Sequence, residues 1–283
     1  MNRALGALLL GAACIALSPI FVRLSEAGPT ATAFWRVALA VPALWLSYFL
    51  RRKNNPGQTS LWLLFAAGLA FAGDLAFWHS SIKLTSVANS TLLANLASIF
   101  VTLAAWLFLR QKPTGVFLAG LAAALVGVAM LVQTSLAFST TGLLGDALGV
   151  VTAMFYAGYI LAVKGLRDRG ETALRLMAVT STITAVILFP VALASGEVML
   201  PHSAYGWWIL LGLALISHAA GQGLIAYALA HLPATFSSVG LLLQPVIAAF
   251  FAWILLAEPL VPLQIAGGVV VLVGIYLARR GSA

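Results

Sequence analysis

An aspartate lies near the middle of a long apolar stretch, in the run Ala72-Gly73-Asp74-Leu75. A charged side chain in hydrocarbon is costly, so it usually faces the protein interior or a watery cavity and marks a functional site. Arg36 lies in a second apolar stretch and is the natural partner of Asp74. Two roles stay open for Asp74: a structural ion pair with Arg36, or direct contact with a substrate or a proton.

Two ring residues, Trp78 and His79, follow Asp74 in the same stretch. Trp78 lies one helical turn from Asp74, which places both side chains on nearly the same face. A tryptophan in a membrane helix is typically a packing residue or an interfacial anchor, but its ring also suits stacking on an aromatic substrate. His79 either belongs to a binding site or is simply solvated near the membrane surface.

More polar residues fall at similar depth in other apolar stretches. His218 and Gln222 are one turn apart, and a histidine there suits either proton relay or a hydrogen bond between helices. Asn95 and Gln244 are neutral amides, which join helices at about 1 kcal/mol each or bind an amino or carboxylate group of a ligand. Tyr156 adds an aromatic ring, with core packing as the alternative.

Two prolines interrupt apolar stretches, Pro19 after Ser18 and Pro245 after Gln244. Proline frees a backbone carbonyl within a helix, and such discontinuities can form binding sites, although a plain kink is the commoner outcome. The four histidines are scattered and the single cysteine is Cys14. We therefore expect no metal site, no cofactor and no catalysis.

The elements that must position these residues are membrane-spanning helices. A bilayer core about 30 Å thick needs roughly 20 apolar residues per helix, and polar gaps divide the 283 residues into ten such segments. The expected spans are Ala4–Leu24, Thr30–Leu50, Leu61–Ile82, Ser86–Leu109, Thr114–Val132, Gly142–Val163, Thr172–Ala194, Tyr205–Ala230, Thr235–Leu256 and Leu260–Ala278. A hydrophobic fraction of 62% and a mean hydropathy of +1.05 exclude an ordinary soluble domain.

The charge distribution predicts the orientation of these spans. The net charge is +8, but the basic residues gather in alternate gaps between spans, so nucleic acid is not the expected partner. Twelve of the 15 lie on one side if ten helices alternate: Arg3, Arg51, Arg52, Lys53, Arg110, Lys112, Lys164, Arg167, Arg169, Arg175, Arg279 and Arg280. The acidic residues Glu26, Asp146, Glu197 and Glu258 fall near the opposite face. The positive-inside rule then places both termini in the cytoplasm.

A weak internal repeat links the two halves of the chain. A shift of 147 residues places Ser90 on Ser237, Trp106 on Trp253, Gly120 on Gly267 and Gly127 on Gly274. These ordered matches predict a duplication, with a first five-helix repeat at 4–132 and a second at 142–279. The glycines at 120, 127, 267, 268 and 274 suit close helix packing or a dimer face.

Five spans is an odd number, so the two repeats must have opposite orientations. Inverted repeats with a site near the membrane midplane are a recurrent device of secondary transporters, which work by alternating access. A passive channel and a membrane-embedded enzyme are the alternatives. A channel normally needs a selectivity ring, and an enzyme needs a convergent set of catalytic residues. The sequence shows neither.

Three stretches resemble a known family. They are Phe34-Trp35-Arg36-Val37-Ala38, the turn Leu84-Thr85-Ser86-Val87-Ala88, and Gln244-Pro245 followed by Glu258-Pro259 and Gln264-Ile265-Ala266-Gly267-Gly268. The chain resembles a drug/metabolite transporter of the EamA type, the ten-helix class with two EamA repeats. The first repeat departs from the pattern, with Ser98 where Pro245 aligns and Gln111 where Glu258 aligns.

This resemblance implies an all-α membrane protein of ten helices in two inverted repeats, in the bacterial inner membrane. Within the family, the chain is most similar to bacterial exporters of aromatic and other hydrophobic amino acids. A broad exporter of drugs or cations is the alternative. The expected partners are a small-molecule substrate and the lipid bilayer, and a homodimer is possible.

Overall fold

The computed structural model describes residues 2–51, 60–85, 87–132, 142–257 and 259–282. Some expectations fell on residues outside these ranges: Arg52, Lys53, Ser86, Glu258 and the 133–141 connection. Within these ranges every regular element is a helix. Ten spans are long and apolar enough to cross a membrane, as the ten-helix fold class predicted.

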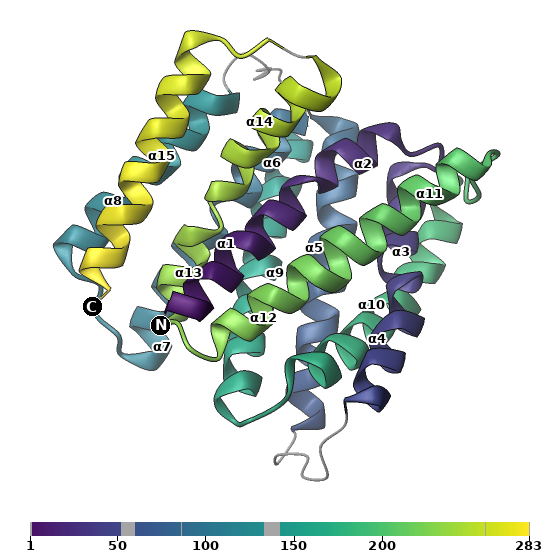
Figure 1. Ribbon diagram of the computed structural model, residues 1–283, viewed down its shortest axis with the longest axis horizontal. Coiled ribbons are helices and arrows are strands. Elements are labelled where there is room, and N and C mark those ends of the chain that lie inside the picture. The colour runs from purple at the N-terminus through teal and green to yellow at the C-terminus, as the bar shows by residue number, and fades with distance from the viewer. Residues whose placement is uncertain (1, 52–59, 86, 133–141, 258, 283) are drawn as a thin grey trace.

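Five spans are single helices, and the other five are divided. The single helices are α5 (Leu61–Leu84), α8 (Gly115–Val132), α9 (Leu143–Asp168), α10 (Ala173–Ala194) and α15 (Pro262–Gly281). The divided spans are α1 (Asn2–Ala16) with α2 (Ser18–Leu24), α3 (Pro29–Ala38) with α4 (Ala40–Leu50), α6 (Val87–Ala94) with α7 (Ala97–Leu109), α11 (Ala204–Gly212) with η3 (Leu213–Gln222) and α12 (Gly223–Leu229), and α13 (Ala234–Gly240) with α14 (Leu243–Leu256). Figure 1 shows them as one bundle of tilted helices.

Short polar side chains start several of these helices. Ser60, Thr172 and Ser203 are the N-caps of α5, α10 and α11, and each side-chain oxygen accepts a hydrogen bond from the backbone N–H three residues later. Such caps satisfy one of the backbone donors that a helix leaves unpaired at its start. The polar gaps between apolar stretches therefore fix the limits of the spans. The largest shift from expectation is at α9, which continues five residues beyond Val163.

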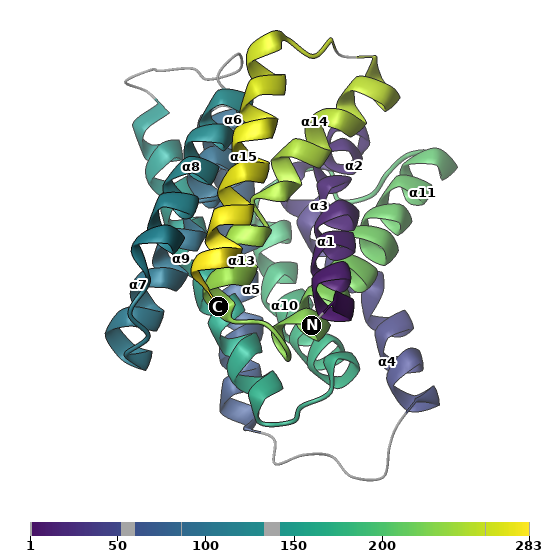
Figure 2. The same ribbon diagram turned by 60° about the vertical axis from the view of Figure 1, so that its left-hand side comes forward.

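Cross-contacts between the two halves follow the symmetry of an inverted repeat. The first span packs on the eighth (α1 on η3 and α12), and the third packs on the sixth (α5 on α9). These two contacts exchange when spans 1–5 are mapped onto spans 6–10. The second span packs on the seventh and the fifth on the tenth, and each of these contacts maps onto itself. Figure 2 shows α8 and α15 lying side by side, as they do in Figure 1.

The α8–α15 contact repeats the same symmetry at single residues. A Cβ built on Gly120 would lie 2.6 Å from the Gly274 carbonyl oxygen, and one on Gly127 would lie 2.7 Å from the Gly267 carbonyl oxygen. The two contacts exchange under the 147-residue shift. Residues without a side chain allow such close backbone approach between membrane helices. The glycines therefore pack within one chain, and a homodimer through another surface stays a prediction.

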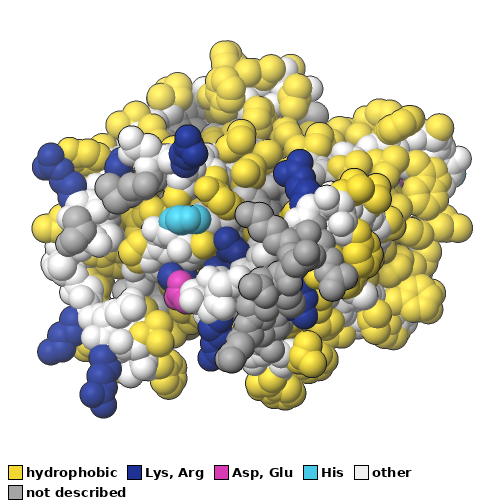
Figure 3. Space-filling model, turned by 60° about the horizontal axis from the view of Figure 1, so that its bottom comes forward, with side chains coloured by type: hydrophobic (Ala, Val, Ile, Leu, Met, Phe, Trp, Pro, Cys, Tyr) yellow, Lys and Arg dark blue, Asp and Glu magenta, His cyan; other side chains and the backbone are white. Residues whose placement is uncertain are grey.

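Basic residues mark one side of the bundle. The side on which α7 ends, α9 turns into α10 and α15 ends carries most of the described lysines and arginines (Figure 3). The opposite side carries Arg23, Lys83 and the acidic residues Glu26, Asp146 and Glu197. The charge count predicted this gathering of basic residues on one side of the bundle. Because the number of spans is even, the two termini lie on that same side.

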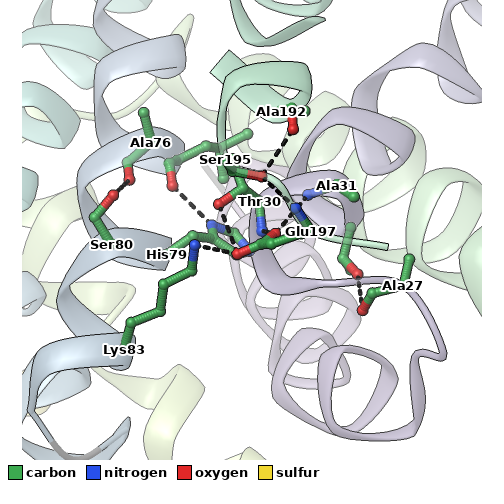
Figure 4. A network of polar contacts seen from close by, with 12 residues as sticks. Ala27, Thr30, Ala31, Ala76, His79, Ser80, Lys83, Ala192, Ser195 and Glu197 are labelled. Carbon is green, nitrogen blue, oxygen red and sulfur yellow. Dashed lines mark hydrogen bonds and ion pairs between the residues drawn. The ribbon is translucent and has the colours of Figure 1, made fainter. Parts of the chain in front are cut away.

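Two glutamates on the acidic side tie the repeats together. Glu197, between α10 and α11, accepts hydrogen bonds from the backbone N–H groups of Thr30 and Ala31 at the start of α3, and pairs with Lys83 (Figure 4). Glu26, between α2 and α3, accepts from the backbone N–H of Ser203 at 3.0 Å and from its hydroxyl at 2.5 Å. Each carboxylate lies at the N-terminus of a helix from the other repeat, where negative charge is favoured.

These carboxylates predict a loss of stability in acid. The hydrogen bond from the Ser203 hydroxyl lowers the pKa of Glu26 below its ordinary 4.5. Partial burial raises the pKa of Glu197, but the bonds from Lys83, Thr30 and Ala31 outweigh it, so that pKa is also lowered. Stabilisation by such a carboxylate is present above the unfolded pKa and is lost as pH falls through the lowered folded pKa.

We therefore expect the melting temperature of the detergent-solubilised protein to fall as pH drops below about 4.5. The Glu26→Gln/Glu197→Gln double variant should melt lower than wild type at neutral pH and should show a shallower fall in acid. Melting curves between about pH 7 and about pH 3 measure both effects. An acid-induced fall of the same size in the double variant would contradict this assignment.

Candidate functional site

A cavity with a volume of about 150 Å³ lies between the two repeats. The first repeat contributes α1, α2, α3, α5 and α6, and the second contributes α9, η3 and α14. The lining residues are Ile15, Ala16, Ser18, Pro19, Arg36, Phe71, Asp74, Leu75, Trp78, Thr91, Ala94, Asn95, Tyr156, Gln222, Gln244, Pro245 and Ala248. An apolar cavity of about this size in another protein holds benzene, so the space suits a ligand with a ring or a short aliphatic side chain.

Helix interruptions surround this cavity. The first span breaks at Leu17, so that Pro19 falls in the first turn of α2. The fourth span breaks at Asn95 and Leu96, and the ninth breaks at Leu241 and Leu242, three residues before Pro245. At the break in the fourth span, the Asn95 side chain donates a hydrogen bond from Nδ2 to the Thr91 carbonyl oxygen at 2.8 Å. Irregular backbone at membrane depth is tolerated where it is buried in protein or lines a cavity, and these breaks meet that condition.

The eighth span carries a different irregularity, a ten-residue π-helix from Leu213 to Gln222. Its wider turns end at Gln222, which lines the cavity with its Oε1 atom buried and without a hydrogen-bond partner. Segments of π-helix within α-helices are frequent at functional sites. Only the small residues that flank His218 distinguish this segment in the sequence.

Arg36 and Asp74 both face the cavity but do not bond to each other. Arg36 is only 6% exposed, and its Nε has no hydrogen-bond partner in the structure. Asp74 is half-buried on the neighbouring α5. Among the described residues, no hydrogen bond joins the two side chains. Every Arg36 nitrogen also lies more than 4.0 Å from the Asp74 carboxylate oxygens, so the two do not form an ion pair.

Aromatic rings form one wall of the cavity. Phe71 and Trp78 lie one turn before and one turn after Asp74 on α5, and Tyr156 adds a ring to the lining from α9. The Tyr156 hydroxyl lies beside the side-chain amides of Gln222 and Gln244. This wall combines apolar ring surface with a few polar atoms, which is the usual composition of a small-molecule site.

The two candidate histidines lie behind this wall rather than in it. His79 is fully buried, and its Nδ1 is hydrogen-bonded to the Leu75 carbonyl at 2.7 Å. Its ring meets the Trp78 ring edge to face, with the ring centroids 4.8 Å apart. His218 is also fully buried, and its Nε2 is hydrogen-bonded to the Ser181 hydroxyl at 2.8 Å. Its ring stacks on the Phe71 ring, with the ring centroids 5.3 Å apart. Each histidine therefore supports a ring that does line the cavity.

A smaller cavity of about 30 Å³ adjoins the first one. Four residues line both cavities and so lie between them: Ala94, Asn95, Tyr156 and Gln244. The remaining polar lining of the small cavity comes from Ser98 and Ser238, which lie nearer the basic side of the bundle. The two cavities therefore share a boundary made of those four residues.

Of the lining residues that sequence reasoning missed, three occupy positions that carried a signal. Phe71 and Thr91 are each about one helical turn from a residue that was singled out, Asp74 and Asn95 respectively. Ser18 directly precedes Pro19. Side chains three or four residues apart share one face of a helix, so each could have been found from its neighbour.

Comparison with known proteins gives the family. The model of the EamA-like transporter family matches residues 2–133 and again residues 143–280. An uncharacterized transporter of Archaeoglobus fulgidus is 29% identical over 270 residues, which cover 91% of each chain. The pseudopaline exporter CntI of Pseudomonas aeruginosa is 26% identical and covers 83% of this chain and 81% of its own.

Further similarities agree with this result. A probable amino-acid metabolite efflux pump of Salmonella typhimurium is 28% identical, with 84% of this chain and 81% of its own covered. One solved crystal structure superposes with a TM-score of 0.81 over 98% of this chain and 97% of its own, at 14% identity, and so shares the fold. Two family matches in tandem account for almost the whole length of the protein. The chain therefore belongs to the EamA-like transporter family.

Proposed function

We propose that this protein exports small amphiphilic metabolites, foremost aromatic or other hydrophobic amino acids, across the bacterial inner membrane by alternating access. The observation that carries this proposal is the cavity at the junction of the two repeats, because rocking of one repeat against the other exposes such a site to each side in turn. Relatives named as an amino-acid metabolite efflux pump and as a terminal-alkyne amino-acid exporter support the substrate class.

The lining of the cavity favours a ligand with an apolar side chain. Phe71, Trp78 and Tyr156 offer ring surfaces, and aromatic pairs contribute about 0.5–1.5 kcal/mol beyond their buried area. Asn95, Gln222 and Gln244 supply the neutral polar atoms that orient a substrate. In this proposal His79 and His218 position Trp78 and Phe71 and do not touch the substrate.

A broad exporter of cations is the second candidate. It is favoured by Asp74, whose carboxylate faces an aromatic-lined cavity where a lipophilic cation would bind. Arg36 in the same cavity opposes it, because a second positive charge there would repel a cation. Competition of labelled phenylalanine with tetraphenylphosphonium separates the two candidates, since an amino-acid exporter should be insensitive to that ion.

The transport test uses purified protein in liposomes. We expect saturable counterflow of labelled phenylalanine into vesicles loaded with unlabelled phenylalanine, which a passive channel does not give. Trp78→Ala should reduce this counterflow about two- to tenfold, since loss of a ring contact worth about 0.5–1.5 kcal/mol corresponds to that range. Asn95→Ala should reduce it as well.

Trp62→Ala is the matched control for this test. Trp62 lies on the same helix as Trp78 but is 76% exposed on the outside of the bundle. Its removal should leave counterflow at the wild-type rate. If Trp78→Ala and Asn95→Ala are folded and also transport at that rate, the cavity is not the substrate site.

A further inference from the structure

The cavity contains one positive and one negative side chain, which no bond neutralises. Arg36 and Asp74 are the only charged residues among its described lining residues. They come from α3 and α5, which pack against each other. The site therefore has a net charge of zero but holds two separated charges, which is an unusual lining for a membrane interior.

Packing does not explain why these two charges stay apart. The Arg36 side chain is more than nine-tenths buried, and its Nε points to no acceptor. A buried charge is normally paired and fully hydrogen-bonded, because desolvation penalises it otherwise. Elsewhere the same chain pairs its charges closely, as Glu171 does with Arg175 at 2.8 Å. A ligand that brings the missing partners would satisfy both side chains.

We propose that Arg36 and Asp74 are the two anchors of a zwitterion site, Arg36 for the carboxylate and Asp74 for the ammonium group of one α-amino acid. This inference rests on the proposed function and names the part of the substrate that the site recognises. A guanidinium binds a carboxylate through a planar fork of N–H donors. The Asp74 carboxylate accepts from the ammonium group.

The neighbouring residues fix how such a ligand would lie. Trp78 is one turn from Asp74, so a side chain that extends from the ammonium-bearing carbon meets the indole ring. The other groups around the pair are neutral: the Tyr156 hydroxyl from α9 and the amides of Gln222 and Gln244 from the second repeat. None of them carries a charge, so Arg36 and Asp74 are the charged anchors that this lining offers. A ligand with a single charge would leave one anchor unpaired.

Three ligands that share a phenyl ring separate the two anchors. Phenylalanine carries both charges, hydrocinnamate only the carboxylate, and phenethylamine only the ammonium group. Equilibrium binding of each radiolabelled compound to detergent-purified protein is measured for wild type, Asp74→Asn and Arg36→Gln. We expect wild type to bind phenylalanine at least about tenfold more tightly than either analogue, because each analogue leaves one buried charge unpaired.

The two variants should then lose different ligands. Asp74→Asn should bind phenylalanine at least about tenfold more weakly than wild type does. It should bind hydrocinnamate as tightly as wild type does, or more tightly. Arg36→Gln should weaken the binding of phenylalanine to the same extent and should keep the wild-type affinity for phenethylamine. Asp168→Asn and Arg279→Gln are the matched controls, since both residues lie on the basic side of the bundle away from the cavity. Both controls should bind all three ligands like wild type.

Opposite results overturn the inference. Asp74 does not bind the ammonium group if Asp74→Asn weakens the binding of hydrocinnamate as much as that of phenylalanine. The same conclusion holds if this variant binds phenylalanine with the wild-type affinity. If Arg36→Gln does not fold, the Asp74→Asn arm decides alone, because it predicts a change of preference and not merely a loss. If wild type neither binds nor transports phenylalanine, the proposed function fails; if it transports phenylalanine and the variants do not discriminate, only the zwitterion site fails.

Discussion

Replacing Gly274 with alanine is expected to destabilise the folded protein by about 3 kcal/mol, at the upper end of the range for overpacking. The new Cβ would lie 2.5 Å from the Ala124 nitrogen and 2.7 Å from the Gly120 carbonyl oxygen. Both obstacles are backbone atoms of α8, so no side-chain rotation relieves the contact. The two helices must separate instead, and they then lose packing along their length.

Thermal loss of the monodisperse protein peak on size-exclusion chromatography measures this effect. Gly120→Ala should behave like Gly274→Ala, because its Cβ would lie 2.4 Å from the Ala278 nitrogen across the same interface. Gly6→Ala is the matched control: it adds the same methyl group on α1 where nothing lies within 4 Å. That variant should be as stable as wild type or slightly more stable, since alanine favours helix. Equal melting of all three variants would show that the α8–α15 contact is not this close.

The spans were predictable because a membrane leaves few choices. About 20 apolar residues are needed for each crossing, and charged gaps such as the one at Arg110 and Lys112 end the apolar stretches sharply. The expected start of α5 at Leu61 agrees with the structure, and its end differs by two residues. The duplication was also readable, because the glycines that pair between α8 and α15 recur at a fixed spacing.

The direction of a side chain around its helix was harder to predict than its depth. Asp74 and Trp78 are one turn apart and both line the cavity. His79 is the next residue, about a quarter of a turn farther round the helix, and its buried ring packs against Trp78. His218 and Gln222 are also about one turn apart, on the π-helix, yet only Gln222 lines the cavity. Depth alone does not separate such neighbours.

Contacts between distant parts of the chain were beyond sequence reasoning. The carboxylates of Glu26 and Glu197 were placed near the outer face by counting, but their bonds to Ser203, Thr30 and Ala31 join the two repeats. The same holds for Arg36 and Asp74. Their sequence positions left open an ion pair or a role in the site, and the helices hold both at one cavity without a bond between them. Only the packing of α3 against α5 decides between those outcomes.

Orientation in the membrane gives an all-or-none prediction. The charge asymmetry predicts that the side carrying Arg51, Arg110 and Arg280 is cytoplasmic. The α10–α11 connection, with Glu197 and His202, then faces outward. In a background in which Cys14 is replaced by alanine, a cysteine at His202 should react with a membrane-impermeant thiol reagent in intact cells, whereas a cysteine at Arg280 should react only after the membrane is permeabilised.

These two positions suit the labelling test because both side chains are exposed. The His202 backbone N–H bonds to Glu26, and substitution of the side chain leaves this bond in place. Arg280 is in the last turn of α15, where its guanidinium lies over the Tyr276 ring. Labelling at Arg280 in intact cells, with protection at His202, would reverse the orientation. It would place the cluster of arginines and lysines on the outer face, against the bias that membrane insertion imposes on short loops.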